Sequence, residues 1–141
     1  MQRQTQRTML RLFGLELSMR RLAALIGWCA VALVVFATLS PIGARPHIAH
    51  MGPQFERFIA YLVAAAALAT AYPSRKGVIL LCIVAGAAGL ELAQYFEASR
   101  HARALDALVK MMGGVSGLAV VTLCERLWSR RIALAPARRP N

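Results

Sequence analysis

The sequence predicts an all-α fold: a polytopic membrane protein, built as a four-helix transmembrane bundle with both termini cytoplasmic. Hydrophobic residue types make up 58% of the 141 residues and charged types only 16%, against about 25% charged in a typical soluble domain. The apolar residues form long uncharged runs, and none of these runs has the strict alternation of a membrane β-barrel strand. The net charge of +11 would suit a nucleic-acid binder. The basic residues instead separate the apolar runs and do not interleave with stacking aromatics, so we expect no nucleic-acid partner.

The first predicted span lies in the uncharged run from Leu22 to Ala44. As a helix, these 23 residues rise about 34 Å, enough to cross a hydrocarbon core of ~30 Å. We expect the helix to end near Ser40, because Pro41 and Gly43 follow.

Three further runs complete the predicted bundle. The second, Phe58 to Ser74, is rich in alanine and has 17 residues, which rise about 26 Å as a helix. The third, residues 77–96, carries one charge, at Glu91. The fourth runs from about Leu105 to Trp128 and has a lysine near its start.

The distribution of Lys and Arg predicts the orientation. Twelve of these residues lie in the N-terminal segment, in the connection between spans two and three, and in the C-terminal part from Arg126 onward, whereas the other two connections hold four. Because basic residues favour the cytoplasmic side, the sequence predicts a basic cytoplasmic segment over residues 1–21, a membrane domain over 22–128 and a disordered basic cytoplasmic tail over 129–141. The four basic residues of the outer connections are Arg45, Arg57, Arg100 and Arg103.

Two interpretations of the N-terminal segment remain open. Residues 5–20 carry a basic, weakly amphipathic pattern that suits a helix lying on an anionic inner leaflet. Alternatively, translation begins at Met9 or Met19 and the upstream residues have no structure. A cleaved signal peptide is disfavoured, because the apolar run exceeds the usual core of about 7–15 residues.

Glu91 is the most informative polar residue. It lies fourteen positions past Gly77, which places it ~21 Å from the inner boundary and ~9 Å below the outer one. A charge at a helix centre costs roughly 2.5–3.5 kcal/mol, so we expect Glu91 to face the bundle interior. Ala87, Ala88 and Gln94 share this helical face. The side chain either fixes helix packing through an ionic partner or lines a functional pocket.

The fourth span offers a complementary stripe. Asp106, Lys110, Gly113 and Gly117 recur on one helical face, and the two glycines form a close-packing motif of membrane helices. Antiparallel packing of spans three and four through these glycines, Ala87 and Ala88 predicts an ion pair between Glu91 and Lys110. The rival is an intrahelical pair between Asp106 and Lys110 at i, i+4.

The outer connections add arginines and histidines. His47, His50 and His101 lack the usual ligand spacing, so we predict no metal and no cofactor. Arg45 and Arg100 are suited to gripping a phosphate or carboxylate bidentately at the membrane surface. The alternative is that these arginines are solvated or contact lipid phosphate.

Several short motifs follow one another between residues 24 and 124. In this order they resemble the VanZ-like family of small bacterial membrane proteins. The motif residues are Ser40-Pro41, Arg45-Pro46, Phe58, Tyr61, Tyr72-Pro73, Arg75, Glu91, Gln94, Arg100, Asp106, Gly113 and Gly117.

The chain departs from the VanZ-like pattern at two positions. Lys110 stands where many members have Asn, and Arg57 stands where His is frequent. The resemblance implies a multi-pass protein of the bacterial cytoplasmic membrane. It also implies a link to susceptibility to glycopeptide antibiotics of the teicoplanin type, which act on cell-wall precursors outside the membrane.

Two functional hypotheses follow. In the first, an outward-facing polar pocket engages membrane lipids, specifically an anionic envelope lipid or glycan precursor. In the second, the chain is a membrane-embedded hydrolase or transferase that uses Glu91 and Asp106 as acid and base. An assembly factor is a third possibility, and the oligomeric state stays open. The pocket residues are Arg45, Glu91, Gln94, Arg100, Asp106 and Lys110.

Overall fold

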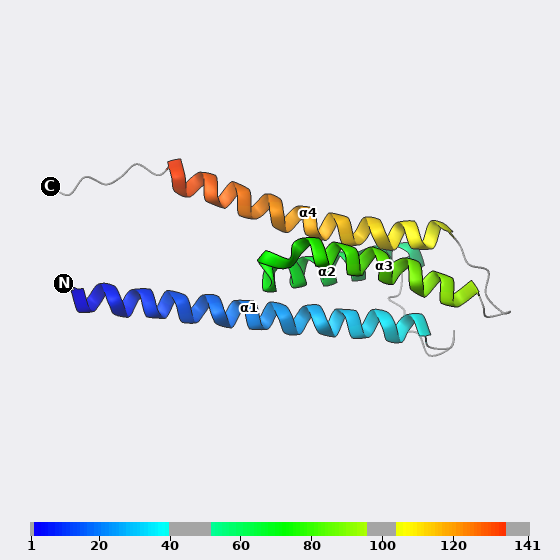
Figure 1. Ribbon diagram of the computed structural model, residues 1–141, viewed down its shortest axis with the longest axis horizontal. Coiled ribbons are helices and arrows are strands. Elements are labelled where there is room, and N and C mark those ends of the chain that lie inside the picture. Colours follow the sequence, from blue (N-terminus) through cyan, green and yellow to red (C-terminus); the bar gives the residue numbers. More distant parts are fainter. Residues whose placement is uncertain (1, 40–51, 96–103, 135–141) are drawn as a thin grey trace.

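The computed structural model describes residues 2–39, 52–95 and 104–134, and these residues form helices and short connections without a strand. The all-α class is therefore confirmed for this part of the chain. The helices run back and forth along one long axis (Figure 1). They are α1 (Gln2–Leu39), α2 (Pro53–Ala71), the 3-10 turn η2 (Pro73–Arg75), α3 (Lys76–Tyr95) and α4 (Ala104–Leu134).

Three stretches of these helices are long and apolar enough to cross a membrane. They are Gly14–Thr38, Pro73–Leu90 and Leu105–Arg131. The stretch in α1 begins before the boundary at Leu22 that the sequence predicts, because α1 continues without a break through the basic N-terminal segment. In the same way α4 continues to Leu134, into the segment for which the sequence predicts a disordered tail.

The remaining helix, α2, lies at the centre of the bundle. It packs against α1 and α4 over most of its length and also touches α3. Most of the buried apolar side chains belong to α2, and Ala65 and Ala69 are fully buried. Large apolar side chains such as Trp28, Leu81 and Leu123 are instead exposed on α1, α3 and α4. A core of small residues with a large-residue exterior is typical of helices that pack in lipid.

Glycines bring the helix backbones together. A Cβ at Gly113 or Gly117 of α4 would overlap the carbonyl oxygens of Phe58 and Leu62 in α2. A Cβ at Gly27 of α1 would lie 2.8 Å from the Leu68 side chain and 3.1 Å from its backbone nitrogen. Real Cβ atoms need more room, so α2 and its neighbours pack this closely only because these positions lack a side chain.

Proline residues set where α2 begins and where the chain reverses. Pro53 occupies the first turn, where its missing N–H costs no hydrogen bond. The last bond of α2 runs from Tyr72 N to Leu68 O at 2.8 Å. Pro73 then follows and cannot donate to the next position of the same helix. As a result, η2 turns the chain back and α3 runs antiparallel to α2 (Figure 1).

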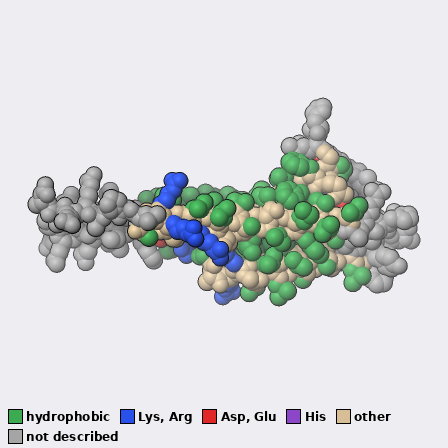
Figure 2. Space-filling view, turned by 90° about the horizontal axis from the view of Figure 1, so that it is seen from above, with side chains coloured by type: hydrophobic (Ala, Val, Ile, Leu, Met, Phe, Trp, Pro, Cys, Tyr) green, Lys and Arg blue, Asp and Glu red, His purple; other side chains and the backbone are tan. Residues whose placement is uncertain are grey.

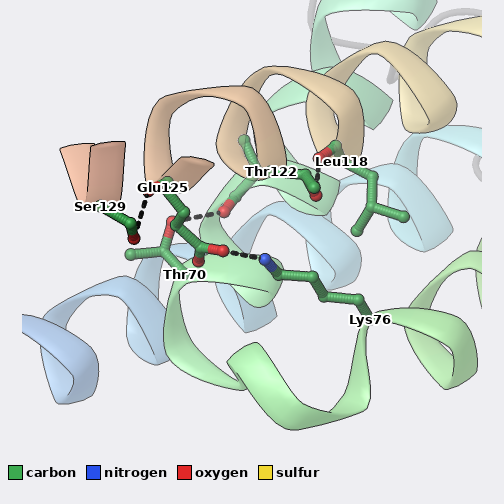
Figure 3. A network of polar contacts seen from close by, with 7 residues as sticks. Thr70, Lys76, Leu118, Thr122, Glu125 and Ser129 are labelled. Carbon is green, nitrogen blue, oxygen red and sulfur yellow. Dashed lines mark hydrogen bonds and ion pairs between the residues drawn. The ribbon is translucent and has the colours of Figure 1, made fainter. Parts of the chain in front are cut away.

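The two ends of the bundle differ. We call the end where α2 passes into α3 the terminal end, because α1 begins and α4 ends on that side, and we call the opposite end the loop end (Figure 1). Lys and Arg side chains gather toward the terminal end, next to a largely apolar middle (Figure 2). At the terminal end an ion pair between Lys76 and Glu125 joins α3 to α4 (Figure 3).

Candidate functional site

Three charged side chains meet at the loop end. Arg57 of α2 forms an ion pair with Asp106 Oδ1 of α4, although the contact lacks the alignment of a hydrogen bond. Lys110 Nζ lies 3.6 Å from Asp106 Oδ2, one helical turn along α4. We call Arg57, Asp106 and Lys110 the loop-end cluster.

Helix positions explain this arrangement. Asp106 lies in the first turn of α4, where the positive end of the helix dipole favours a carboxylate. Lys110 follows at i+4, with the acid on the N-terminal side, the order that favours an intrahelical pair. Gly113 lies against the Phe58 carbonyl of α2. This close approach of α4 to α2 brings the neighbouring Arg57 within reach of Asp106.

The members of the cluster differ in burial. The side chain of Lys110 is 3% exposed and that of Asp106 is 8% exposed, whereas that of Arg57 is 33% exposed. Removing two charges from water costs several kcal/mol per ion, and good pairing is needed to offset the cost. The ion pairs of Asp106 provide this pairing. Arg57 is the member that a molecule outside the bundle can reach.

The cluster determines what Asp106 can do chemically. Two cations flank its carboxylate, Arg57 at Oδ1 and Lys110 at Oδ2. An aspartate held in this way orients both cations, and neither oxygen is left open for proton transfer with a substrate. The geometry therefore favours an anchoring role for Asp106 over general acid catalysis.

The structure brings only part of the predicted pocket together. Asp106 and Lys110 lie side by side, as the rival intrahelical pair requires. Glu91 and Gln94 belong to the last turns of α3, but their side chains are not among those described, so the ion pair between Glu91 and Lys110 stays a prediction.

Several of the predicted residues belong to the two connections that the structure does not describe. Arg45 and Arg100 lie outside the described residues, as do the three histidines. Within the described ranges, no three His, Cys, Asp or Glu side chains are close enough to hold a metal ion.

The predicted packing residues have a different partner from the expected one. Ala87 is fully buried, whereas Ala88 is exposed. Gly113 and Gly117 pack against α2 rather than α3, which corrects the expected seam between spans three and four. Gly114, the glycine between them, is the one that faces Ile83 of α3. The glycines of α4 thus allow close contact with α2 on one face and with α3 on the adjacent face.

Arg57 is the residue that the predicted pocket omitted. It lies 49 positions before its partner Asp106 in the chain, so no local pattern connects the two. A signal was nevertheless present: an arginine in the second turn of a helix, directly before an apolar run, needs an anionic partner when the helix is buried.

The comparisons with known proteins give no match. No family model, no curated protein and no solved structure is significantly similar to this chain. Its function is therefore inferred from the residues and the geometry.

Proposed function

We propose that the chain is a multi-pass protein of the bacterial cytoplasmic membrane in which four helices cross the bilayer. Three stretches are apolar enough to do so. The helices α1 and α3 run in the same direction (Figure 1), so α2, which connects them in sequence, has to return across the same layer. The excess of Lys and Arg toward the terminal end then favours a cytoplasmic location for both termini.

Reporter fusions test this topology. A reporter that fluoresces only in the cytoplasm is expected to be bright when fused after Lys76 or after Asn141 and dark when fused after Ala98. The two bright fusions also serve as expression controls. Fluorescence from the Ala98 fusion would place the loop end in the cytoplasm and contradict the proposed orientation.

We further propose that the loop end binds an anionic envelope lipid or a glycan precursor at the outer face of the membrane. The observation that carries this proposal is the loop-end cluster, in which two cations surround one carboxylate among the described side chains. Asp106 holds Arg57 in place, and Arg57 remains one-third exposed. A guanidinium presents a planar fork that matches a phosphate or carboxylate. We place Arg45 and Arg100 in the same outer region and assign them the same role.

Binding is favoured over catalysis. The alternative of a hydrolase or transferase needs Asp106 or Glu91 to exchange protons with a substrate. Each oxygen of Asp106 is engaged by a cation, which hinders its contact with a substrate proton.

The resemblance to the VanZ-like family suggests a physiological context. The order of its motifs along residues 24–124 is the support for membership, which we propose on that basis. A protein that binds cell-wall precursors or envelope lipids outside the membrane would alter susceptibility to glycopeptide antibiotics of the teicoplanin type, because these drugs act on such precursors.

Native mass spectrometry of the detergent-purified chain tests the binding function. We expect an anionic lipid or lipid-linked glycan to copurify with the parent protein and to be lost from Arg57→Gln. Arg57→Lys should retain it only weakly, because an ammonium lacks the planar fork. Arg126→Gln, which removes a cation at the terminal end, is the control and should behave like the parent. Equal copurification with the parent and Arg57→Gln would refute the assignment.

A further inference from the structure

A groove opens between α1, α2 and α3. Its volume is about 430 Å³, and side chains of all three helices line it. The walls are mostly apolar. Representative lining residues are Val31 and Val35 of α1, Leu68 of α2, and Val78, Cys82 and Gly86 of α3.

The groove has a polar mouth at the terminal end. Trp28 Nε1 donates a hydrogen bond to the Tyr72 hydroxyl at 3.3 Å, and both side chains line the groove together with Arg75. Trp and Tyr are enriched where a membrane meets water. Arg75 is exposed, and the described residues give its guanidinium no ion pair, whereas the adjacent Lys76 is paired with Glu125.

The length of the groove fits a lipid chain. Its lining on η2 and α3 extends from Arg75 to Leu90, which corresponds to ~22 Å along a helix. One leaflet contributes only half of a hydrocarbon core of ~30 Å. An acyl chain that enters beside Arg75 can therefore lie in the groove over the full depth of its leaflet.

We propose that this groove binds one anionic phospholipid from the leaflet on the terminal side. Its acyl chain packs against the apolar walls, and Arg75 binds its phosphate bidentately, beside Trp28 and Tyr72. Charge complementarity selects this occupant, because the terminal end is rich in Lys and Arg (Figure 2) and attracts anionic lipids. This lipid site is separate from the ligand proposed for the loop end.

Native mass spectrometry with added lipids provides the test. The full chain in detergent is titrated with phosphatidylglycerol or with phosphatidylcholine carrying the same acyl chains. We expect the parent to bind one phosphatidylglycerol about tenfold more tightly than phosphatidylcholine. Both lipids carry the phosphate, but the cationic trimethylammonium of phosphatidylcholine is repelled by Arg75 and the other basic residues of the terminal end. Arg75→Gln should abolish this preference, while Arg126→Gln should keep it.

A pair of glycine variants tests the groove itself. A Cβ at Gly86 or at Gly89 meets no atom within 4 Å, so the backbone at both positions has room for a side chain. Only Gly86 lines the groove. Gly86→Leu should therefore lose both lipids at least tenfold, a loss of more than ~1.4 kcal/mol, while Gly89→Leu should bind them as the parent does.

Three results would overturn the proposal. The first is equal affinity of the parent for the two lipids, and the second is equal binding by Gly86→Leu and Gly89→Leu. The third is a dimer of the parent that Gly86→Leu converts to a monomer, which would assign the groove to a second copy of the chain. Arg57→Gln leaves this site intact, so failure here and failure of the proposed loop-end function are distinguishable.

Discussion

A single methyl group at Gly117 is expected to separate α4 from α2. A Cβ there would lie 3.1 Å from both Ala65 Cβ and Ala66 N and would overlap the carbonyl oxygen of Leu62. Carbon approaches a carbonyl oxygen to about 3.3 Å, so α4 would have to retreat by on the order of 1 Å. The atoms in the way are backbone and an alanine methyl, which no rotamer change can move. We therefore expect Gly117→Ala to cost about 1–3 kcal/mol, offset by a gain of about 1 kcal/mol in helix propensity.

The matched control is Gly89→Ala, because a Cβ at Gly89 meets nothing within 4 Å. Both variants gain the same helix propensity, so their difference isolates the packing cost. The assay is unfolding in mixed micelles by titration with a denaturing detergent, followed by circular dichroism. Gly117→Ala should unfold earlier by about 1–3 kcal/mol relative to the control. Equal stability of the two variants would refute the close packing of α4 on α2.

Three double-mutant cycles test the ion pairs in the same assay. Asp106→Asn is expected to cost about 3–5 kcal/mol because it deprives the buried Lys110 of its carboxylate, and adding Lys110→Met should recover part of this loss. Glu91→Gln combined with Lys110→Met tests the predicted interhelical pair: coupling would support it, whereas strictly additive losses would contradict it. The third cycle combines Lys76→Ala with Glu125→Ala, at a pair whose side chains are 21% and 46% exposed. The two variants should couple by at most about 1 kcal/mol. A larger coupling would be inconsistent with an exposed pair.

The sequence was enough to predict the helical segments, but not which helices pack against each other. A membrane segment has to satisfy its own backbone hydrogen bonds, so long uncharged runs identify helices whatever surrounds them. The spacing of Gly113 and Gly117 indicates that another backbone comes close, but it does not say which one. The sequence interpretation chose α3, while the structure places α2 there. Which helix packs against these glycines depends on the arrangement of all four helices in the bundle.

The same distinction applies to the candidate site. The pair of Asp106 and Lys110 is local, so the spacing of four residues within one helix was enough to raise it as an alternative. Arg57 reaches Asp106 only through the packing of α2 on α4. Local spacing therefore could not identify its partner. The sequence interpretation chose Arg45 and Arg100 of the connections as anion-binding groups, whereas the arginine that the structure places in the cluster lies inside a helix.

The position of α2 shows why apolarity alone is a poor guide to the centre of such a bundle. In lipid, large apolar side chains gain nothing from facing a helix rather than the bilayer, and close packing of small residues holds helices together. The helix with most neighbours is then rich in alanine, as α2 is, with Ala64, Ala65 and Ala69 buried. α2 is nevertheless not among the stretches that qualify as spans by length and composition. It has only 19 residues, and its first turns carry Gln54, Glu56 and Arg57. The helix that falls outside these stretches is the one that contacts all three others.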